Sequence, residues 1–170
     1  MTSFPPPVFV DEVEPAVPYV DESSLDEEGL TVLRETTAML GVVPNAARTY
    51  LHRPDIARMI HAFYHTIVLT ERSNLDVALK NKLGVICSST NGCVYCTSHQ
   101  CNVAQSTKGV DWGLGDDDLL ALISGFDEGK DDVERVCFEY ARVASQDPGA
   151  VDAALLDRMK SVLSPAQIVG

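Results

Sequence analysis

Two cysteines and a histidine lie close together in the middle of the chain, within residues 93–99, whose sequence is CVYCTSH. On a helix, residues three apart share a face with Cβ atoms about 5 to 6 Å apart, so Cys93 and Cys96 can form a disulfide after a modest local change. His99 follows Cys96 by the same spacing and can accept or return a thiol proton. The spacing therefore predicts a redox-active cysteine pair with a histidine base.

A helix that begins at Cys93 would place its unpaired N–H groups and its positive dipole end beside the cysteines, and so would favour a thiolate. The dipole contributes about 0.3 to 1 kcal/mol, whereas a positioned base contributes about 3 to 5 kcal/mol. Because Cys96 is nearer to His99, we expect Cys96 to attack the substrate and Cys93 to resolve the product.

The same residues also allow a structural zinc site or an inactive remnant of a redox site. Zinc is disfavoured, because Cys93, Cys96 and His99 supply only three ligands and Cys101 is rotated off their helical face. Cys87 and Cys137 lie beside apolar residues and are expected to pack as small buried hydrophobes, as is Cys101. His61 and His65 lack the intervening Glu of a zinc protease and are expected to be structural.

The cysteine segment and the helix before it resemble the carboxymuconolactone decarboxylase and alkylhydroperoxidase D-like family. The resemblance is carried by residues 91–96 (NGCVYC) with the following His, by Leu83, Val85 and Ile86, and by residues 41–45 (GVVPN). It covers roughly residues 39–125. It implies an all-helical fold with the cysteine motif at the start of a core helix, often a homo-oligomer, and peroxide-reducing or thiol-disulfide chemistry.

The chain departs from this family at the groups that would move a proton. In the resembled peroxidases three residues separate the second cysteine from the histidine, whereas here two do, and Gln100 holds the other position. Asn81 stands where those enzymes carry a relay Glu, and an amide can orient an imidazole but cannot take its proton. A complete relay would need another acid, for which Glu71 and Asp76 are the candidates.

We therefore expect a thiol-dependent peroxidase or thiol-disulfide oxidoreductase whose partners are a peroxide and a thiol or protein reductant. The thiolate would become a sulfenic acid, which the second cysteine resolves to a disulfide. No cofactor and no metal are required. Two alternatives are a cofactor-free decarboxylase or lactone-processing enzyme, which has no use for a cysteine pair, and a noncatalytic oligomeric subunit.

Helical periodicity recurs through the rest of the chain, and no segment alternates with the period of a strand. The first stripe, Leu30, Leu33, Thr37 and Leu40, ends at Gly41. Pro44 opens a short segment. The remaining helices are expected at about 55–69, 74 or 76–90, 93–107, 116–124, 131–147 and 151–163. The apolar face of the helix at 55–69 consists of Ile56, Met59, Ile60, Phe63 and Ile67.

Residues 1–30 differ from the remainder, with eight acids, five prolines and no Lys or Arg. This composition predicts an acidic arm, either loose or docked, followed by one helical domain over residues 31–170. Residues 164–167 (SPAQ) have the pattern of a helix start close to the chain end. We therefore expect the polypeptide to continue beyond Gly170 or to have lost a helix.

The whole composition limits the classes of function. The chain has 170 residues, 45% of them hydrophobic, and a net charge of −12. A field of that sign repels a phosphate backbone, which argues against nucleic acid. The uncharged run between Lys82 and Lys108 is too polar to span a bilayer, and no leader sequence is recognisable, so we expect a cytoplasmic protein without membrane contact.

Overall fold

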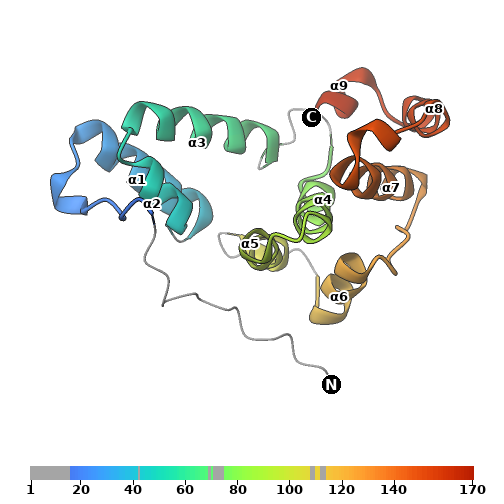
Figure 1. The fold of residues 1–170 in the computed structure, drawn as a ribbon, viewed down its shortest axis with the longest axis horizontal. Coiled ribbons are helices and arrows are strands. Elements are labelled where there is room, and N and C mark those ends of the chain that lie inside the picture. The colour runs from blue at the N-terminus through green and yellow to red at the C-terminus, as the bar shows by residue number, and fades with distance from the viewer. Residues whose placement is uncertain (1–15, 42, 69, 71–74, 108–109, 112–113) are drawn as a thin grey trace. The chain divides into compact units, whose positions relative to one another are not determined.

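The computed structural model describes residues 16–41, 43–68, 70, 75–107, 110–111 and 114–170, and these form nine α-helices (Figure 1). The predicted all-helical fold is confirmed, with two two-residue strands, β1 and β2, between α5 and α6. The helices are α1 (Glu27–Leu40), α2 (Asn45–Tyr50), α3 (Pro54–Val68), α4 (Val77–Thr90), α5 (Val94–Gln105), α6 (Asp116–Ser124), α7 (Asp132–Gln146), α8 (Ala153–Val162) and α9 (Pro165–Val169). The strands are β1 (Ser106–Thr107) and β2 (Val110–Asp111), and the 3₁₀ turns are η1 (Glu22–Ser24) and η2 (Pro148–Ala150).

Side-chain caps explain where most of these helices begin. Asp76 accepts a hydrogen bond from the Ala78 N–H at the start of α4, and Asp131 accepts one from the Glu134 N–H at the start of α7. These bonds satisfy backbone donors that a helix leaves without a partner in its first turn. At α6 the cap is Gly115, and Asp116 is the first residue of the helix.

The chain divides into two compact units, Met1–Thr66 with Thr107–Gly109 and Ile67–Ser106 with Val110–Gly170. The expected arm over residues 1–30 and single domain over residues 31–170 stay a prediction. The first unit contains α1, α2 and most of α3. Its core consists of Val32, Leu51 and Ala57, with Val20, Leu25 and Leu33 packed against them. A separate apolar cluster explains why these helices form a unit of their own.

The buried face of α1 is offset from the predicted stripe. The stripe was expected at Leu30, Leu33, Thr37 and Leu40, but the buried residues are Gly29, Val32, Thr36 and Met39. Each predicted position lies one residue, or about 100°, from the position that is buried. The apolar residues of α1 cover both faces, so their spacing did not determine which one the neighbouring helices cover.

The apolar face of α3 points away from the core of its unit. Met59 and Phe63 are 73% and 69% exposed, and Ile56 and Ile60 are also exposed, whereas the fully buried residue of α3 is Ala57. Periodicity located this face correctly. It could not indicate that α1 and α2 pack against the opposite side of the helix.

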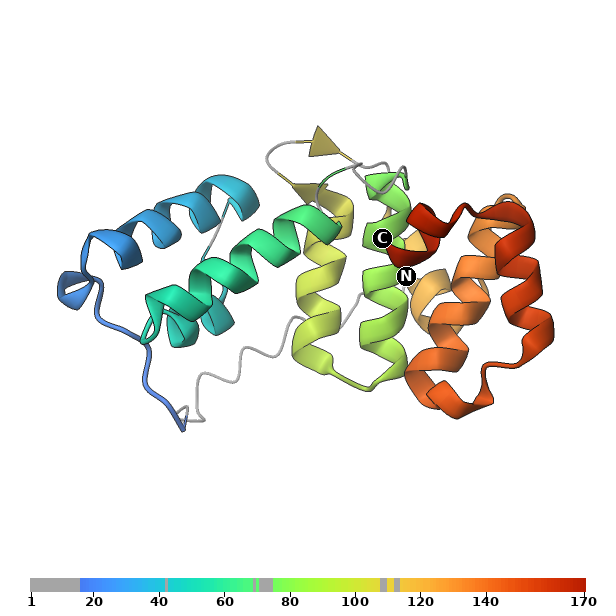
Figure 2. The same ribbon diagram turned by 90° about the horizontal axis from the view of Figure 1, so that it is seen from above.

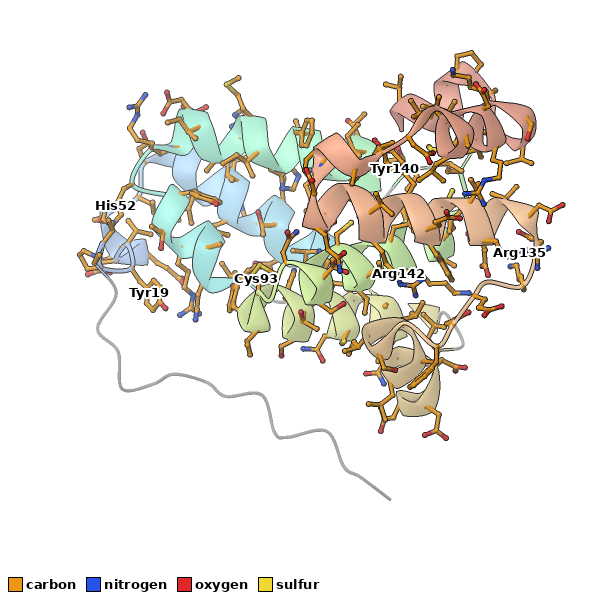
Figure 3. All side chains as sticks on the ribbon, turned by 45° about the vertical axis from the view of Figure 1, so that its right-hand side comes forward. Tyr19, His52, Cys93, Arg135, Tyr140 and Arg142 are labelled. Atoms are coloured by element: carbon orange, nitrogen blue, oxygen red, sulfur yellow. A yellow bond between two sulfur atoms is a disulfide. The ribbon has the colours of Figure 1, made fainter. Side chains whose placement is uncertain are left out.

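The described end of the N-terminal arm is docked within the first unit. The Val20 N–H donates to the Arg48 carbonyl at 3.2 Å, and the His52 Nε2 lies 2.7 Å from the Pro18 carbonyl, near Tyr19 (Figure 3). Helix α1 begins at Glu27, within the last residues of the expected arm. Residues 1–15 lie outside the described part of the chain.

Helix α4 lies at the centre of the second unit, with α5, α6 and α7 packed around it (Figure 2). Its buried side chains Val85 and Ile86 meet a core that includes Ala104, Leu122 and Phe138. Helices α8 and α9 follow α7 at the end of the chain. None of the described helices is both long and apolar enough to cross a bilayer.

Candidate active site

The cysteine pair lies at the tight connection between α4 and α5. Asn91 ends α4, and Gly92 adopts a φ of +67° that residues with a Cβ rarely take. The N–H groups of Gly92 and Cys93 donate to the Ser89 and Ser88 carbonyls at 3.0 and 3.1 Å. The turn therefore directs the chain back along α4 and starts α5 immediately after Cys93.

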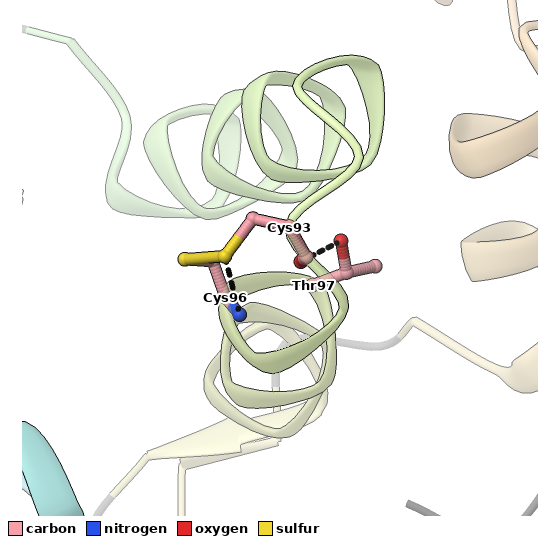
Figure 4. Close-up of a disulfide and its surroundings, with 3 residues drawn as sticks. All are labelled: Cys93, Cys96 and Thr97. Carbon is pink, nitrogen blue, oxygen red and sulfur yellow. Dashed lines mark hydrogen bonds between the residues drawn. A yellow bond between two sulfur atoms is a disulfide. The ribbon is translucent and has the colours of Figure 1, made fainter. Parts of the chain in front are cut away.

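Cys93 and Cys96 are joined by a disulfide, with Cα atoms 5.3 Å apart (Figure 4). The Cys96 N–H donates to the Cys93 Sγ at 3.2 Å. The Cys93 carbonyl accepts hydrogen bonds from the N–H and the hydroxyl of Thr97, both at 2.9 Å. Cys93 thus caps the first turn of α5 with its own sulfur.

The surroundings of the pair favour a negative sulfur. The N-terminus of a helix carries a partial positive charge, and residues 77–110 contain no Asp or Glu that would oppose a thiolate. After reduction, the Cys96 N–H that now donates to Cys93 Sγ would stabilise a thiolate at that sulfur. Both cysteines are half-buried, so solvent and small reactants have access to them.

His99 lies one helical turn after Cys96 and is also half-buried. Burial lowers the pKa of its imidazole from the ordinary value of 6.5, so the ring is neutral near pH 7 and able to accept a proton. Among the described hydrogen bonds, none joins His99 to either sulfur or to a carboxylate. Its role as the base of the site stays a prediction.

Asn81 lies on α4, fully buried, and neither its Nδ2 nor its Oδ1 has a hydrogen-bond partner among the described residues. Gln100 lies on α5, with an Oε1 that is likewise buried and without a partner in the described part of the chain. Gln100 packs over Gly84, where an added Cβ would come within 2.7 Å of Oε1. The two amides therefore belong to the same α4–α5 hairpin.

Sequence reasoning noted Gln100 only as the residue at the usual histidine position and did not identify it as a candidate for function. Two local signals were present: it follows Cys96 by four residues, and Gly84 leaves room for it on the opposing helix. These two signals can be interpreted only when it is known that α4 packs against α5, and the sequence alone does not show that packing.

Of the two candidate relay acids, one lies within the described residues and one outside them. Asp76 is exposed and caps α4 through its 2.9 Å hydrogen bond from the Ala78 N–H, five residues before Asn81. Glu71 lies outside the described residues. Asp76 has no described contact with His99, and the relay through an acid stays a prediction.

The other cysteines form no disulfide, and the histidine pair belongs to the first unit. Cys137 is buried as predicted, and burial together with the charges of Asp131 and Glu134 raises its pKa to about 11. Burial also raises the pKa of half-buried Cys101. His61 and His65 stack in the first unit, with centroids 6.4 Å apart. The described residues contain no cluster of three or more potential metal ligands.

No protein-family model matches the sequence, and no curated protein matches it significantly. Two crystal structures of the debrominase Bmp8 resemble the chain. A cysteine-to-alanine variant of Bmp8 in complex with 2,3,4-tribromopyrrole has a TM-score of 0.75 and 22% identity, over 94% of this chain and 81% of that chain. Apo Bmp8 has a TM-score of 0.72 and 22% identity, over 89% and 77% of the two chains. At this identity the likeness shows a shared fold.

Proposed function

We propose that the chain is a dithiol-disulfide oxidoreductase of the alkylhydroperoxidase D-like type that reduces hydroperoxides. The observation that supports the proposal most directly is the Cys93–Cys96 disulfide on the first turn of α5, in surroundings that favour a thiolate. A pair of sulfurs that passes between dithiol and disulfide supplies two electrons, which is what the reduction of one peroxide requires.

The cycle has three balanced steps. The Cys96 thiolate attacks one peroxide oxygen, the O–O bond breaks, and the leaving alkoxide takes a proton, which gives a sulfenic acid and an alcohol. The Cys93 sulfur then attacks the Cys96 sulfur and releases water, which forms the disulfide. Two equivalents of a small thiol, or one reduced protein dithiol, exchange with this disulfide through a mixed disulfide and restore both thiols.

The surface beside the pair suits a protein reductant. Val94 and Tyr95, which lie between the cysteines, are 70% and 51% exposed. Exposed aromatic and apolar side chains are favourable contact points for another protein, and here they flank the bond that must be reduced. The proposed electron donor therefore approaches the first turn of α5.

Counting free thiols tests this function. Adding one equivalent of hydrogen peroxide to the reduced protein is expected to remove two thiols per chain, and an added thiol donor should restore them. Cys101→Ser, which removes a half-buried thiol from the same helix, should still lose two. If the reduced protein loses none, the peroxidase function is rejected, and a function that does not consume peroxide is favoured.

Reductive debromination is the second candidate, since the fold is shared with a debrominase that was crystallised with a brominated pyrrole. In that reaction the carbon–bromine bond is replaced by a carbon–hydrogen bond, bromide leaves, and the two thiols become a disulfide. Incubation of the reduced protein with 2,3,4-tribromopyrrole, followed by measurement of bromide and of thiol loss, distinguishes the candidates. Bromide released in proportion to disulfide would support this function, whereas thiol loss with peroxide alone would support the first.

A further inference from the structure

The α4–α5 hairpin contains two buried amide side chains with unpaired polar atoms that the proposed cycle does not use. Asn81 is 0% exposed, yet its amide donor and its carbonyl acceptor both lack a partner among the described residues. The buried Oε1 of Gln100 lacks one as well. A buried polar group without a hydrogen bond destabilises a fold, so the unpaired atoms of these two amides call for a hydrogen-bonding partner.

The position of these amides relates them to the cysteines. Gln100 lies one helical turn beyond Cys96 on α5, and its side chain lies over Gly84 of α4. Asn81 precedes Gly84 by three residues and therefore occupies the same face of α4. Gln100 and Asn81 thus lie on one side of the α4–α5 hairpin, and Cys96 precedes Gln100 by one helical turn.

The chemistry of the unpaired atoms defines what they can bind. Asn81 Nδ2 is a donor, while Asn81 Oδ1 and Gln100 Oε1 are acceptors. Two carbonyl oxygens repel an anion, and neither amide ionises. The nearby cations are engaged elsewhere, Lys80 with the Thr70 carbonyl and Lys82 with Glu134. A neutral group that both donates and accepts a hydrogen bond, such as a hydroxyl, fits this set.

We propose that Asn81 and Gln100 form a neutral subsite that binds the hydroxyl end of the hydroperoxide beside Cys96. The inference rests on the proposed peroxidase function and assigns the residues that recognise its substrate. The Asn81 amide donates to a peroxide oxygen, and the Gln100 carbonyl accepts the peroxide O–H. The subsite selects neutral protic oxidants over anionic or aprotic ones, and Gly84 is the residue that admits Gln100 to it.

The test compares two oxidants of the dithiol, one protic and one aprotic. Asn81→Leu and Gln100→Met replace each amide with an apolar side chain of similar size. With hydrogen peroxide or tert-butyl hydroperoxide, each variant is expected to lose thiols at least about tenfold more slowly than the wild type. With diamide, which oxidises thiols without a hydroxyl group, each should stay within about twofold.

Control variants separate recognition from general damage. Asn102→Leu, on the exposed face of the same helix, should leave both rates unchanged. Gly84→Ala should displace Gln100, because the added methyl would clash with its carbonyl, and should slow the peroxide reaction selectively. Far-ultraviolet circular dichroism would show that each variant is folded.

Three outcomes would be decisive. Selective loss of the peroxide reaction in Asn81→Leu and Gln100→Met supports the subsite. Unchanged peroxide rates, or equal slowing with both oxidants, overturn it and leave the amides with a structural role only. If diamide oxidises the wild-type dithiol but peroxide does not, the proposed peroxidase function is rejected, and the peroxide subsite is rejected with it.

Discussion

The two sulfurs of the disulfide have different neighbours. Cys93 Sγ accepts the Cys96 N–H, whereas Cys96 lies one turn from both His99 and Gln100. The hydrogen bond favours a thiolate at Cys93, and the proximity to the base and to the proposed subsite favours attack by Cys96. In the proposed division of roles, Cys96 attacks the peroxide. Cys93, which the hydrogen bond stabilises as a thiolate, then resolves the sulfenic acid.

Trapping of the sulfenic acid tests that division. After treatment with peroxide, Cys93→Ser is expected to accumulate a sulfenic acid that dimedone labels at Cys96, because the resolving thiol is absent. Cys96→Ser should give no label. Mass spectrometry locates the label, and labelling of Cys93 in Cys96→Ser with none at Cys96 in Cys93→Ser would reverse the assignment.

The lowered pKa of His99 predicts how the peroxide reaction depends on pH. Because burial lowers this pKa from 6.5, the ring loses its capacity to accept a proton only at pH values below 6.5. We expect the His99→Gln variant to react about 10²-fold more slowly near neutral pH, with a smaller deficit at alkaline pH where the thiol ionises unaided.

Stopped-flow oxidation between pH 5 and pH 9 measures this profile, with His65→Gln, an exposed histidine of α3, as the control. A constant ratio of wild-type to His99→Gln rates across the range would show that His99 is not the base.

Replacing Asn81 with Glu tests whether the missing acid limits turnover. The new carboxyl would be fully buried, and burial raises the pKa of a carboxyl towards neutrality, where it can both donate and accept a proton. Glu also keeps the hydrogen-bonding capacity of the amide. We expect peroxide turnover at pH 7 to rise about tenfold in Asn81→Glu. A rate that stays level or falls would show that this chain does not depend on such a relay.

At the scale of elements, one ion pair joins the helix that precedes the site to the rest of the second unit. Lys82 of α4 lies 2.9 Å from Glu134 of α7, and their side chains are only 16% and 5% exposed. Lys130 lies 3.4 Å from the same carboxylate, and Lys82 also approaches the ring of Phe138 at 6.0 Å. These contacts hold α4 and α7 together and so support the helix that carries Asn81.

Glu134→Gln is therefore expected to lower the free energy of unfolding by about 3 to 5 kcal/mol, because it leaves Lys82 without its counter-charge in a buried position. Chemical denaturation at pH 7 measures the change. Glu27→Gln removes a pair in which the Glu27 side chain is 86% exposed and should have little effect. A similar loss in both variants would contradict a special role for the buried pair.

The same pair also makes stability depend on pH. Burial opposes ionisation of Glu134, but hydrogen bonds from Lys130 and Lys82 and the charges of both lysines outweigh it and hold the pKa below 4.5. The stabilisation is present above the unfolded pKa and is lost as pH falls through the lower folded value. As pH falls below the folded pKa of Glu134, the unfolding free energy of Glu134→Gln should thus approach that of the wild type.

At the scale of the whole molecule, the apolar face of α3 predicts self-association. Ile56, Met59, Ile60 and Phe63 form one exposed stripe, and exposed apolar stripes of this kind commonly mark protein interfaces. A second copy can bury the same stripe symmetrically. We expect Phe63→Glu to shift the protein towards monomer in sedimentation velocity at micromolar concentration.

His65→Glu places the same charge on a different face of α3 and should leave the assembly intact. A wild-type protein that sediments only as an 18 kDa monomer would reject this prediction.

The sequence alone was sufficient for the features that depend on neighbouring residues. Helix starts were expected at residue 74 or 76, near residue 131 and at Ser164, and a helix end at Gly41. The structure places caps at Asp76, Asp131 and Ser164 and ends α1 at Gly41. These signals act through hydrogen bonds and backbone angles within one turn of helix. The proximity of Cys93 and Cys96 follows from the same local geometry.

The tertiary structure alone decided which surfaces are covered. It placed the buried face of α1 one residue away from the predicted stripe, turned the apolar face of α3 outward, and buried Asn81 completely. It also brought Gln100 over Gly84, a pairing between residues on two helices. Burial and pairing depend on which helices meet and on how each helix is rotated about its own axis. The helical periodicity of one segment is the same in every such arrangement, so periodicity alone cannot predict which face is buried.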